Sequence, residues 1–304
     1  MSRIEVKRHL GPRDIQAVQE LLDAATAADA HPALDEHSWL DLVQGGREGF
    51  AGLVATEAGH DHPVGYAQVS RGPDSWGLEF VVDPHHRVPG STIGADLVAA
   101  AADVIRAEGG GHLHLWVSQP RPETERAAVA IGLRPGRVIY QMRRSLPVDP
   151  LLLGPAGLLP TRPFRPGVDE EAWLEVNNRA FDWHPEQGGW DLDTIKGRER
   201  QAWFDPDGFL VHQVGTRIAG FCWTKVHPDR HPALGEIYVI AVDPDFAGAG
   251  LGRRLVLAGL DHLARHGVTV GMLYVDADNA GAVKLYVDLG FVVDHIDQAY
   301  VGDV

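Results

Sequence analysis

The stretch at residues 241–275 reads AVDPDFAGAGLGRRLVLAGLDHLARHGVTVGMLYV, and it matches an earlier stretch at residues 81–117, VVDPHHRVPGSTIGADLVAAAADVIRAEGGGHLHLWV. Aligned on the Asp-Pro pair that both contain, each copy predicts a strand, a turn with glycine, an amphipathic helix and a second strand. The unit is too large for a solenoid repeat. The sequence therefore predicts two copies of one mixed α/β fold in tandem.

The strand before the second turn carries one conspicuous charge. Residues 236–242 read EIYVIAV, so both strand faces are almost entirely apolar and Glu236 is the exception. A strand that is apolar on both faces is typical of the middle of a covered sheet. After the turn, the apolar spacing predicts a helix from about Gly250 to His266.

Length, composition and charge limit the function classes. The chain has 304 residues, 44 % of them hydrophobic, and 27 basic against 42 acidic residues give a formal charge of −15. This balance disfavours broad binding to nucleic acid or anionic membranes. The first residues lack the apolar stretch of a signal peptide, and no 18-residue apolar run occurs. We therefore expect a cytoplasmic, monomeric protein.

Prolines mark the division of the chain. Six of the 20 prolines lie between Pro147 and Pro166, and similar strand and helix patterns begin near Arg3 and near Thr161. Such a stretch is typical of a linker. We predict domains at residues 1–146 and 159–304, joined by a proline-rich linker at 147–158.

The turn of the second copy resembles an anion-binding loop. Residues 247–252 read AGAGLG and join the strand to the helix. Glycines let the backbone approach a ligand, while the first N–H groups of a helix point outward. The spacing fits neither a dinucleotide-binding loop nor a triphosphate loop. The alternative is a tight structural turn without a ligand.

A second motif follows about 30 residues later. It reads N279-x-x-A282-x-x-L285-Y286-x-x-x-G290-F291. Together with the VDP sequence and the glycine loop, it resembles the GNAT superfamily of acyl-CoA N-acyltransferases. One position departs from the family pattern, since Ala247 stands where the family usually has Arg or Gln.

This resemblance implies a mixed α/β acyltransferase fold that binds acetyl-CoA. The backbone after Glu236 would pair with the pantetheine arm, the glycine loop would hold the pyrophosphate, and the later motif would complete the site. The cofactor-binding residues implied in the second half are Ile240, Ala241, Val242, Ala247, Gly248, Ala249, Gly250, Leu251, Gly252, Arg253, Asn279, Ala282 and Lys284. Those implied in the first half are Phe80, Val81 and Val82.

Within the superfamily, nearly the whole chain resembles the mycothiol synthases, tandem GNAT enzymes of actinobacteria. The resemblance rests on longer segments, which are VNNRAFDWHPEQGGW from Val176, WFDPDG from Trp203, FCWTKVHP from Phe221, GEIYVIAVDP from Gly235 and LYVDADN from Leu273. It implies acetylation of the cysteinyl amine of a cysteine-glucosamine-inositol conjugate. The substrate-binding residues that it implies are Glu36, Glu186, Lys225, Glu236 and Tyr274.

Amide formation from a thioester needs a neutral amine and a protonated thiol leaving group. Glu236 is the candidate base, because a carboxylate can take the proton of an α-ammonium group near pH 7. Tyr286 is the candidate acid, since a neutral phenol can donate to a developing thiolate. A backbone N–H of residues 239–241 could stabilise the oxyanion if a bulge leaves it free. The alternatives are an ion-paired structural carboxylate and a packed tyrosine.

The first copy lacks these proton-transfer residues. The alignment places Trp76 opposite Glu236 and Ala128 opposite Tyr286. Its loop, VPGSTIG at residues 88–94, retains two glycines. We therefore expect a non-catalytic first domain that can hold acetyl-CoA.

Neither the histidines nor the single cysteine gives a catalytic pattern of its own. His112 and His114 share a strand face and His227 and His231 fall in a predicted loop, without metal-ligand spacing. We therefore expect no metal. Cys222 is expected to be buried and inert, so transfer would be direct.

Two other functions remain open at this stage. One is acetylation of a different amine, such as an aminoglycoside or a protein N-terminus. The other is a non-catalytic acetyl-CoA sensor.

Overall fold

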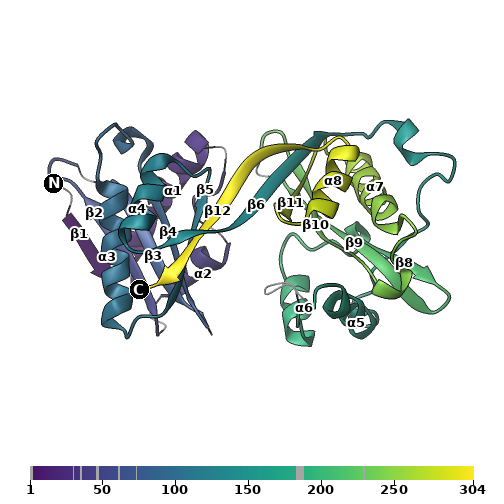
Figure 1. The fold of residues 1–304 in the computed structure, drawn as a ribbon, viewed down its shortest axis with the longest axis horizontal. Helices are drawn as coiled ribbons and strands as arrows, with labels where there is room; N and C mark the ends of the chain where they lie inside the picture. Colours follow the sequence, from purple (N-terminus) through teal and green to yellow (C-terminus); the bar gives the residue numbers. More distant parts are fainter. Residues whose placement is uncertain are drawn as a thin grey trace. The chain divides into compact units, whose positions relative to one another are not determined.

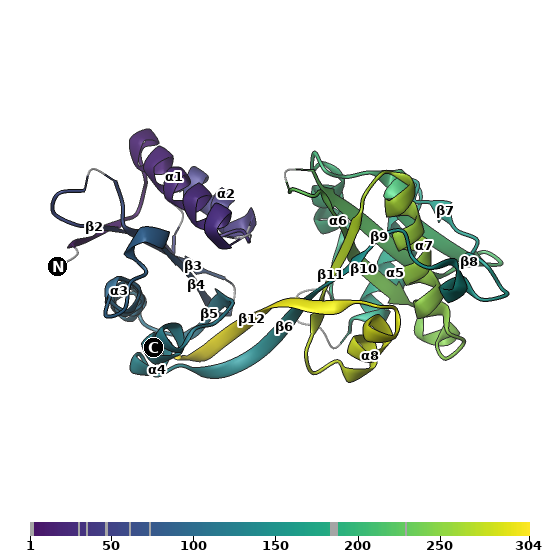
Figure 2. The ribbon, with the colours of Figure 1, turned by 90° about the horizontal axis from the view of Figure 1, so that it is seen from above.

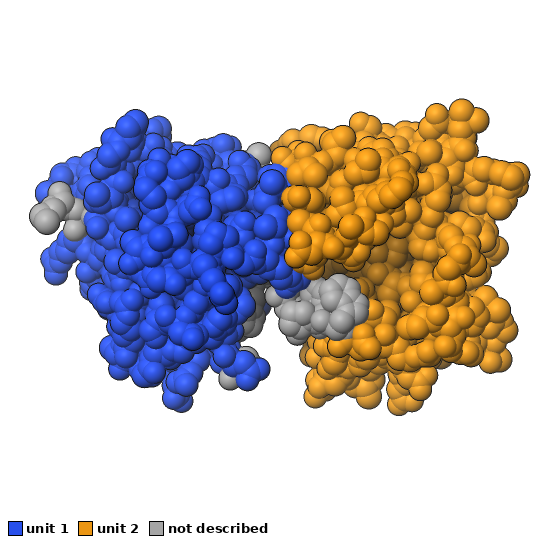
Figure 3. All heavy atoms as spheres, viewed as in Figure 1, with its two compact units in different colours: residues 1–139, 295–304 blue, residues 140–294 orange. Residues whose placement is uncertain are grey.

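The computed structural model describes residues 3–29, 31–34, 36–45, 48–60, 62–72, 74–182, 188–228 and 230–304, without the side chains of residues 36, 37 and 44. The chain forms two compact units, shown in different colours in Figure 3. The first unit comprises residues 1–139 and 295–304, and the second comprises residues 140–294.

A mixed sheet forms the centre of the first unit. Its strands follow the order β1-β2-β3-β4-β5-β12-β6. They span Arg3–Lys7 (β1), Phe50–Thr56 (β2), Gly65–Arg71 (β3), Trp76–Val82 (β4), His112–Ser118 (β5), Arg134–Ser145 (β6) and Val292–Asp303 (β12). Strands β1 to β4 are antiparallel neighbours, whereas β4 and β5 are parallel.

Helices cover both faces of this sheet (Figure 2). They span Pro12–Asp29 (α1), Glu36–Gln44 (α2), Ile93–Ala107 (α3) and Pro122–Ala130 (α4). Successive residues of a strand point to opposite faces. Accordingly, Leu53 packs in the cluster under α3 and α4, while its neighbour Val54 packs under α1.

The second unit repeats this architecture. Its strand order continues from β6 as β11-β10-β9-β8-β7. The strands span Arg162–Pro163 (β7), Phe209–Val214 (β8), Arg217–His227 (β9), Leu234–Val242 (β10) and Val270–Asp276 (β11). The helices span Glu170–Ala180 (α5), Leu192–Glu199 (α6), Leu251–Arg265 (α7) and Ala280–Asp288 (α8). The described residues also include short 3₁₀ turns at Pro84–His86, Pro150–Leu153, Pro206–Gly208 and Pro244–Phe246.

Aromatic rings fill the core between α5 and the second sheet. The rings of Phe164 and Trp223 both stack on the ring of Phe209, and each ring centroid lies 4.3 Å from that of Phe209. Trp173 of α5 meets this group edge-on, 5.6 Å from Phe209. The other face of the sheet packs its aliphatic side chains against α7 and α8.

The division into units differs from the predicted domains of 1–146 and 159–304. The last ten residues belong to the first unit, because residues 297–303 of β12 pair with residues 112–118 of β5. Conversely, residues 140–146 belong to the second unit, and the N–H of Leu146 donates to Thr269. The two halves of the chain therefore exchange a strand (Figure 1).

In both units, the pairing between two parallel neighbouring strands stops at equivalent positions. In the second unit, the parallel pairing of β10 with β11 runs from Leu234 to Glu236, although both strands, described throughout, continue beyond it. In the first unit, the pairing of β4 with β5 ends at Leu78. Backbone groups beyond these points are left to another partner.

Among the helices of the described ranges, none combines the length and the apolar character that a membrane span requires.

The carboxylate of Asp169 is held at the start of α5 by two arginines. Burial raises the pKa of Asp169, but hydrogen bonds from Arg165 and Arg162 outweigh it and lower the pKa to about 2. The charged form therefore stabilises the fold above the ordinary pKa of 3.8, and this stabilisation is lost as the pH falls through about 2.

We expect Asp169→Asn to lower the free energy of unfolding by about 2 kcal/mol at pH 7. The difference between the variant and the parent should shrink towards acid pH, because protonation removes the same charge from the parent. Urea midpoints measured from pH 7 downward test this, with the exposed Asp182→Asn as control. A difference that does not change with pH would contradict this assignment of the charge.

Candidate active site in the second unit

A buried carboxylate lies where β10 leaves β11. Glu236 is 7 % exposed and is the last residue of β10 that pairs with β11. One of its oxygens, Oε2, lies 2.7 Å from Nε2 of His227, the last residue of β9. A carboxylate can only accept, so the imidazole donates through Nε2–H.

The pairing of β10 with its other neighbour, β9, is also irregular shortly after Glu236. The pairing of β10 with β9 shifts register between Ile237 and Val239, which leaves Tyr238 in a bulge. Beyond the bulge, β10 pairs with β9 alone, and alternate N–H groups of such a strand point towards its open edge. A bulge, expected from the sequence only as a condition for oxyanion stabilisation, is therefore present, and alternate N–H groups of residues 239–241 face the open edge of the strand.

The glycine loop follows from the end of the same strand. Gly248 and Gly250 have φ values of +88° and +70°, a backbone that L side chains rarely adopt. The first helical hydrogen bond of α7 runs from the N–H of Arg254 to Gly250, so the N–H groups of Leu251–Arg253 precede the helical ladder. The described first turn contains no acidic residue. This end of α7 can hold an anion such as a pyrophosphate.

The side chain of Arg253 makes a hydrogen bond outside the glycine loop. Its Nη2 donates to the carbonyl of Leu152 over 3.3 Å, which fastens the proline-rich segment to α7. Its positive charge remains beside the loop.

Tyr286 lies on α8 and is 7 % exposed. Burial, and secondly the neighbouring Cys222, raises the pKa of Tyr286 to about 12. The phenol is therefore neutral at physiological pH and can serve as a hydrogen-bond donor. It packs edge-on against Phe291, 5.8 Å away between ring centroids.

Two further motif residues have local structural roles. Asn279 caps α8, because its side chain accepts from the N–H of Ala282 over 3.1 Å. Lys284 pairs with Asp288 at 2.6 Å on the exposed side of α8. These contacts explain part of the motif without a ligand.

The thiol of Cys222 is fully buried, and burial raises its pKa to about 12. A thiol that stays protonated is a poor nucleophile. The expected burial of Cys222 is confirmed, and its lack of reactivity stays a prediction.

The ammonium group of Lys225 makes cation–π contacts with two aromatic rings. Its Nζ is 4.4 Å from the ring centroid of Trp203 and 5.5 Å from that of Tyr238, the bulge residue. Lys225 is also the cross-strand partner of Glu236. Cation–π contacts of this kind hold an ammonium group at a fixed place beside the carboxylate.

Tyr274 is 41 % exposed on β11, and its hydroxyl is held by a buried amide. Gln141 of β6 donates to the Tyr274 hydroxyl over 2.7 Å, and Arg143 donates to the other end of the same amide over 2.8 Å. The hydroxyl is thus fixed while the ring edge stays accessible.

The remaining predicted residues fall into two groups. Glu186 and the side chain of Glu36 lie outside the described residues. Phe80, Val81 and Val82 lie in the first unit on β4, where the strand still pairs with β3 but no longer with β5.

Sequence reasoning missed His227 and Gln141. The sequence predicts a loop at His227, whereas the residue ends strand β9. One signal was available, since Lys225 and His227 are two residues apart and therefore share a strand face. Nothing near Gln141 in the sequence indicates its contact with Tyr274.

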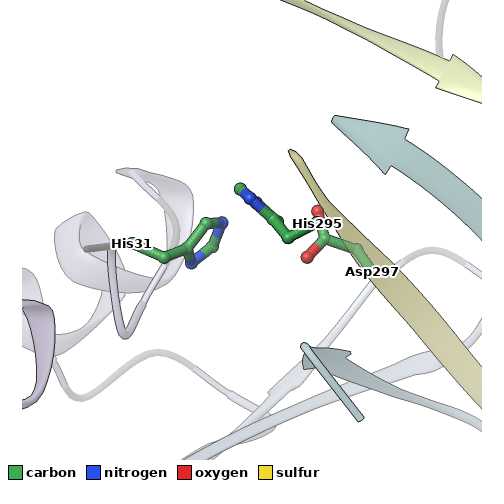
Figure 4. Close-up of side chains that lie close together, drawn as sticks. All are labelled: His31, His295 and Asp297. Atoms are coloured by element: carbon green, nitrogen blue, oxygen red, sulfur yellow. The ribbon is translucent and has the colours of Figure 1, made fainter. Parts of the chain in front are cut away.

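A different cluster of metal-ligating side chains lies in the first unit (Figure 4). Ligand atoms of His31, His295 and Asp297 lie within 4.8 Å of one another. His31 donates through Nδ1 to the carbonyl of Pro32, and Asp297 accepts from Ser118, both over 2.6 Å. A zinc ion at this place would have to replace the hydrogen bonds that His31 and Asp297 make within the protein.

Similar proteins and structures give an independent comparison. A model of the acetyltransferase (GNAT) family matches residues 172–291. The mycothiol acetyltransferase of Acidimicrobium ferrooxidans is 44 % identical over 288 residues, covering 94 % of this chain and 93 % of that protein. The mycothiol acetyltransferase of Nocardia farcinica is 42 % identical, with 94 % and 93 % covered.

Among solved structures, a GCN5-related N-acetyltransferase from Sphaerobacter thermophilus aligns with a TM-score of 0.73 at 23 % identity, covering 99 % of this chain and 95 % of that one. A tandem GNAT protein from the clavulanic acid biosynthesis pathway aligns with a TM-score of 0.67 at 17 % identity, covering 100 % and 98 %. At these identities the likeness establishes the fold alone.

The absence of a metal stays a prediction that elemental analysis can test. We expect protein purified without chelator to contain no stoichiometric zinc, because two of the three groups in the His31 cluster, His31 and Asp297, already hydrogen-bond within the protein. Equilibrium dialysis against zinc should show no tight site. One zinc per chain that is lost in Asp297→Asn would contradict this expectation.

Proposed function

The chain belongs to the mycothiol acetyltransferase family of GNAT acetyltransferases, and from this premise we propose that it acetylates the cysteinyl amine of a cysteine-glucosamine-inositol conjugate, giving mycothiol. The chain is thus an acetyltransferase of a class that uses acetyl-CoA, and the predicted fold of two tandem GNAT-like domains is confirmed. The exact acceptor, the roles of individual residues and the cofactor contacts are our proposal.

One observation carries the proposed mechanism. Glu236, whose carboxylate is buried, is the last residue of β10 that pairs with β11, and the bulge at Tyr238 and the open strand edge follow within a few residues. A base and a set of backbone donors are therefore neighbours in one strand. This arrangement suits a reaction in which an amine loses a proton while a carbonyl oxygen gains charge.

The residues of the second unit fit acetyl-CoA. The open edge of residues 240–242 can pair with the amides of the pantetheine arm, and the N-terminal turn of α7 can hold the pyrophosphate. Arg253 and Arg254 add positive charge there. When bound, acetyl-CoA supplies the thioester whose acetyl group is transferred.

Proton transfers are then divided between two side chains. Glu236 takes a proton from the ammonium form of the acceptor, which frees the lone pair of the nitrogen. Tyr286 donates to the sulfur of the departing thiol. With its pKa near 12, the phenol stays neutral before transfer and acts first as a hydrogen-bond donor.

Polar groups beside Glu236 suit a polyhydroxylated acceptor. The fixed hydroxyl of Tyr274 and the ammonium group of Lys225 can bind sugar or inositol oxygens. We propose Glu186 and Glu36 as additional contacts on the family resemblance alone.

The first unit is proposed to hold acetyl-CoA without catalysing transfer. Its open edge at Phe80–Val82 and a pocket of about 340 Å³ beside the loop at residues 88–93 support binding. The described pairing of β3 with β4 has no bulge, however, and Glu57 and Asp96 bring negative charge to the loop. We therefore expect weaker binding here than in the second unit.

The acceptor is tested by mass spectrometry of the protein incubated with acetyl-CoA and cysteinyl-glucosaminyl-inositol. We expect one acetyl group on the cysteinyl amine and release of one CoA, at a rate well above that with free cysteine, glucosamine or an aminoglycoside. Equal transfer to these amines would contradict the proposed acceptor. Binding of acetyl-CoA without transfer to any amine would instead indicate a sensor.

The proposed acid and base are tested in separate variants. We expect Glu236→Gln to lower kcat by about 10²- to 10⁴-fold, because it removes the base without changing the shape. Tyr286→Phe should lower kcat by about tenfold or more, since it removes only the donor hydroxyl. Calorimetry should show unchanged acetyl-CoA affinity for Glu236→Gln. Full activity of either variant would exclude its assigned role.

A further inference from the structure

We propose that His227 is a positioning residue for the base, and that it holds the carboxylate of Glu236 so that Oε1 faces the acceptor amine. The inference rests on the proposed function for its catalytic consequence. The contact itself is a property of the free protein.

The first argument is geometric. His227 Nε2 and Glu236 Oε2 lie 2.7 Å apart, within the range of a charge-assisted hydrogen bond. The two residues come from neighbouring antiparallel strands, β9 and β10, so both backbones are fixed by the sheet. A side chain held in this way has little freedom to turn its second oxygen elsewhere.

The second argument concerns the irregular backbone that follows the pair. Glu236 is the last residue of β10 that pairs with β11, and the bulge at Tyr238 lies two residues further on. Glu236 is therefore still paired on both sides, but the regular ladder is interrupted shortly after it. The bond from His227 adds a side-chain restraint just before this interruption.

The third argument concerns the proton. With Nε2–H donated to Oε2, the unprotonated nitrogen of His227 is Nδ1, and the free carboxylate oxygen is Oε1. When the acceptor ammonium reacts, its N–H bond breaks and an O–H bond forms at Oε1, which leaves the electron pair on nitrogen. His227 keeps its own proton throughout this step.

Lys225 is the other cation of β9 near the carboxylate, but its ammonium group lies over Trp203 and Tyr238. His227, in contrast, contacts a carboxylate oxygen of Glu236 directly. This assigns different roles to the two side chains, and Lys225 is the one proposed to contact the acceptor.

A matched pair of variants tests the proposal. His227→Leu removes the donor, whereas His227→Gln keeps an N–H donor at nearly the position of Nε2. We expect His227→Leu to lower kcat by about 10- to 100-fold with little change in the KM for acetyl-CoA. His227→Gln should restore most of the loss, and the exposed His266→Leu should behave like the parent. Thermal unfolding of all three variants identifies any that are simply misfolded.

A second readout is independent of activity. In ¹⁵N-histidine-labelled protein, we expect His227 to be the Nε2–H tautomer, and we expect its signals to shift in Glu236→Gln. If the tautomer is as expected and no variant or parent transfers acetyl to any amine, the proposed function fails while the contact stands. If the parent is active and His227→Leu is equally fast, the positioning role is overturned. If His227→Gln is as slow as His227→Leu, the imidazole itself is the base.

Discussion

Strand β10 loses its parallel neighbour after Glu236, and the chemistry proposed for the second unit depends on that loss. A buried strand must satisfy its backbone N–H and C=O groups. Here the pairing with β11 ends while β10 continues to Val242, so amide groups are left for a ligand with amides of its own. The same strand then leads into the glycine loop and α7. One irregularity therefore aligns a carboxylate, a row of backbone groups and an anion-binding helix end.

Much of this arrangement could be predicted because its signals are local. The repeated Asp-Pro, the isolated charge of Glu236 and the glycines before α7 each indicate a structure within a few residues. Left-handed backbone at Gly248 and Gly250 explains why glycine stands there. The bulge at Tyr238 was expected only as a condition of catalysis, since a register shift depends on the partner strand and leaves no mark in the strand itself.

Contacts between distant segments could not be predicted in this way. The residue pattern of a strand such as β6 or β12 does not reveal in which unit the strand pairs. The sequence therefore did not indicate the exchange. Gln141 reaches Tyr274 across 133 residues of chain, and His227 reaches Glu236 through a turn that looked like an open loop. Such pairings follow from sheet register and not from local propensity.

The exchange of strands has a consequence for how the second unit is built. Gln141, which fixes the hydroxyl of Tyr274, precedes the proline-rich segment and lies on a strand that begins in the first unit. A fragment that starts at the linker would lack this strand and its buried amide. The first unit lacks Glu236 and Tyr286 counterparts, with Trp76 and Ala128 buried at those positions. It nevertheless contributes to the sheet of the second unit, because strand β6 begins in the first unit and continues into the second.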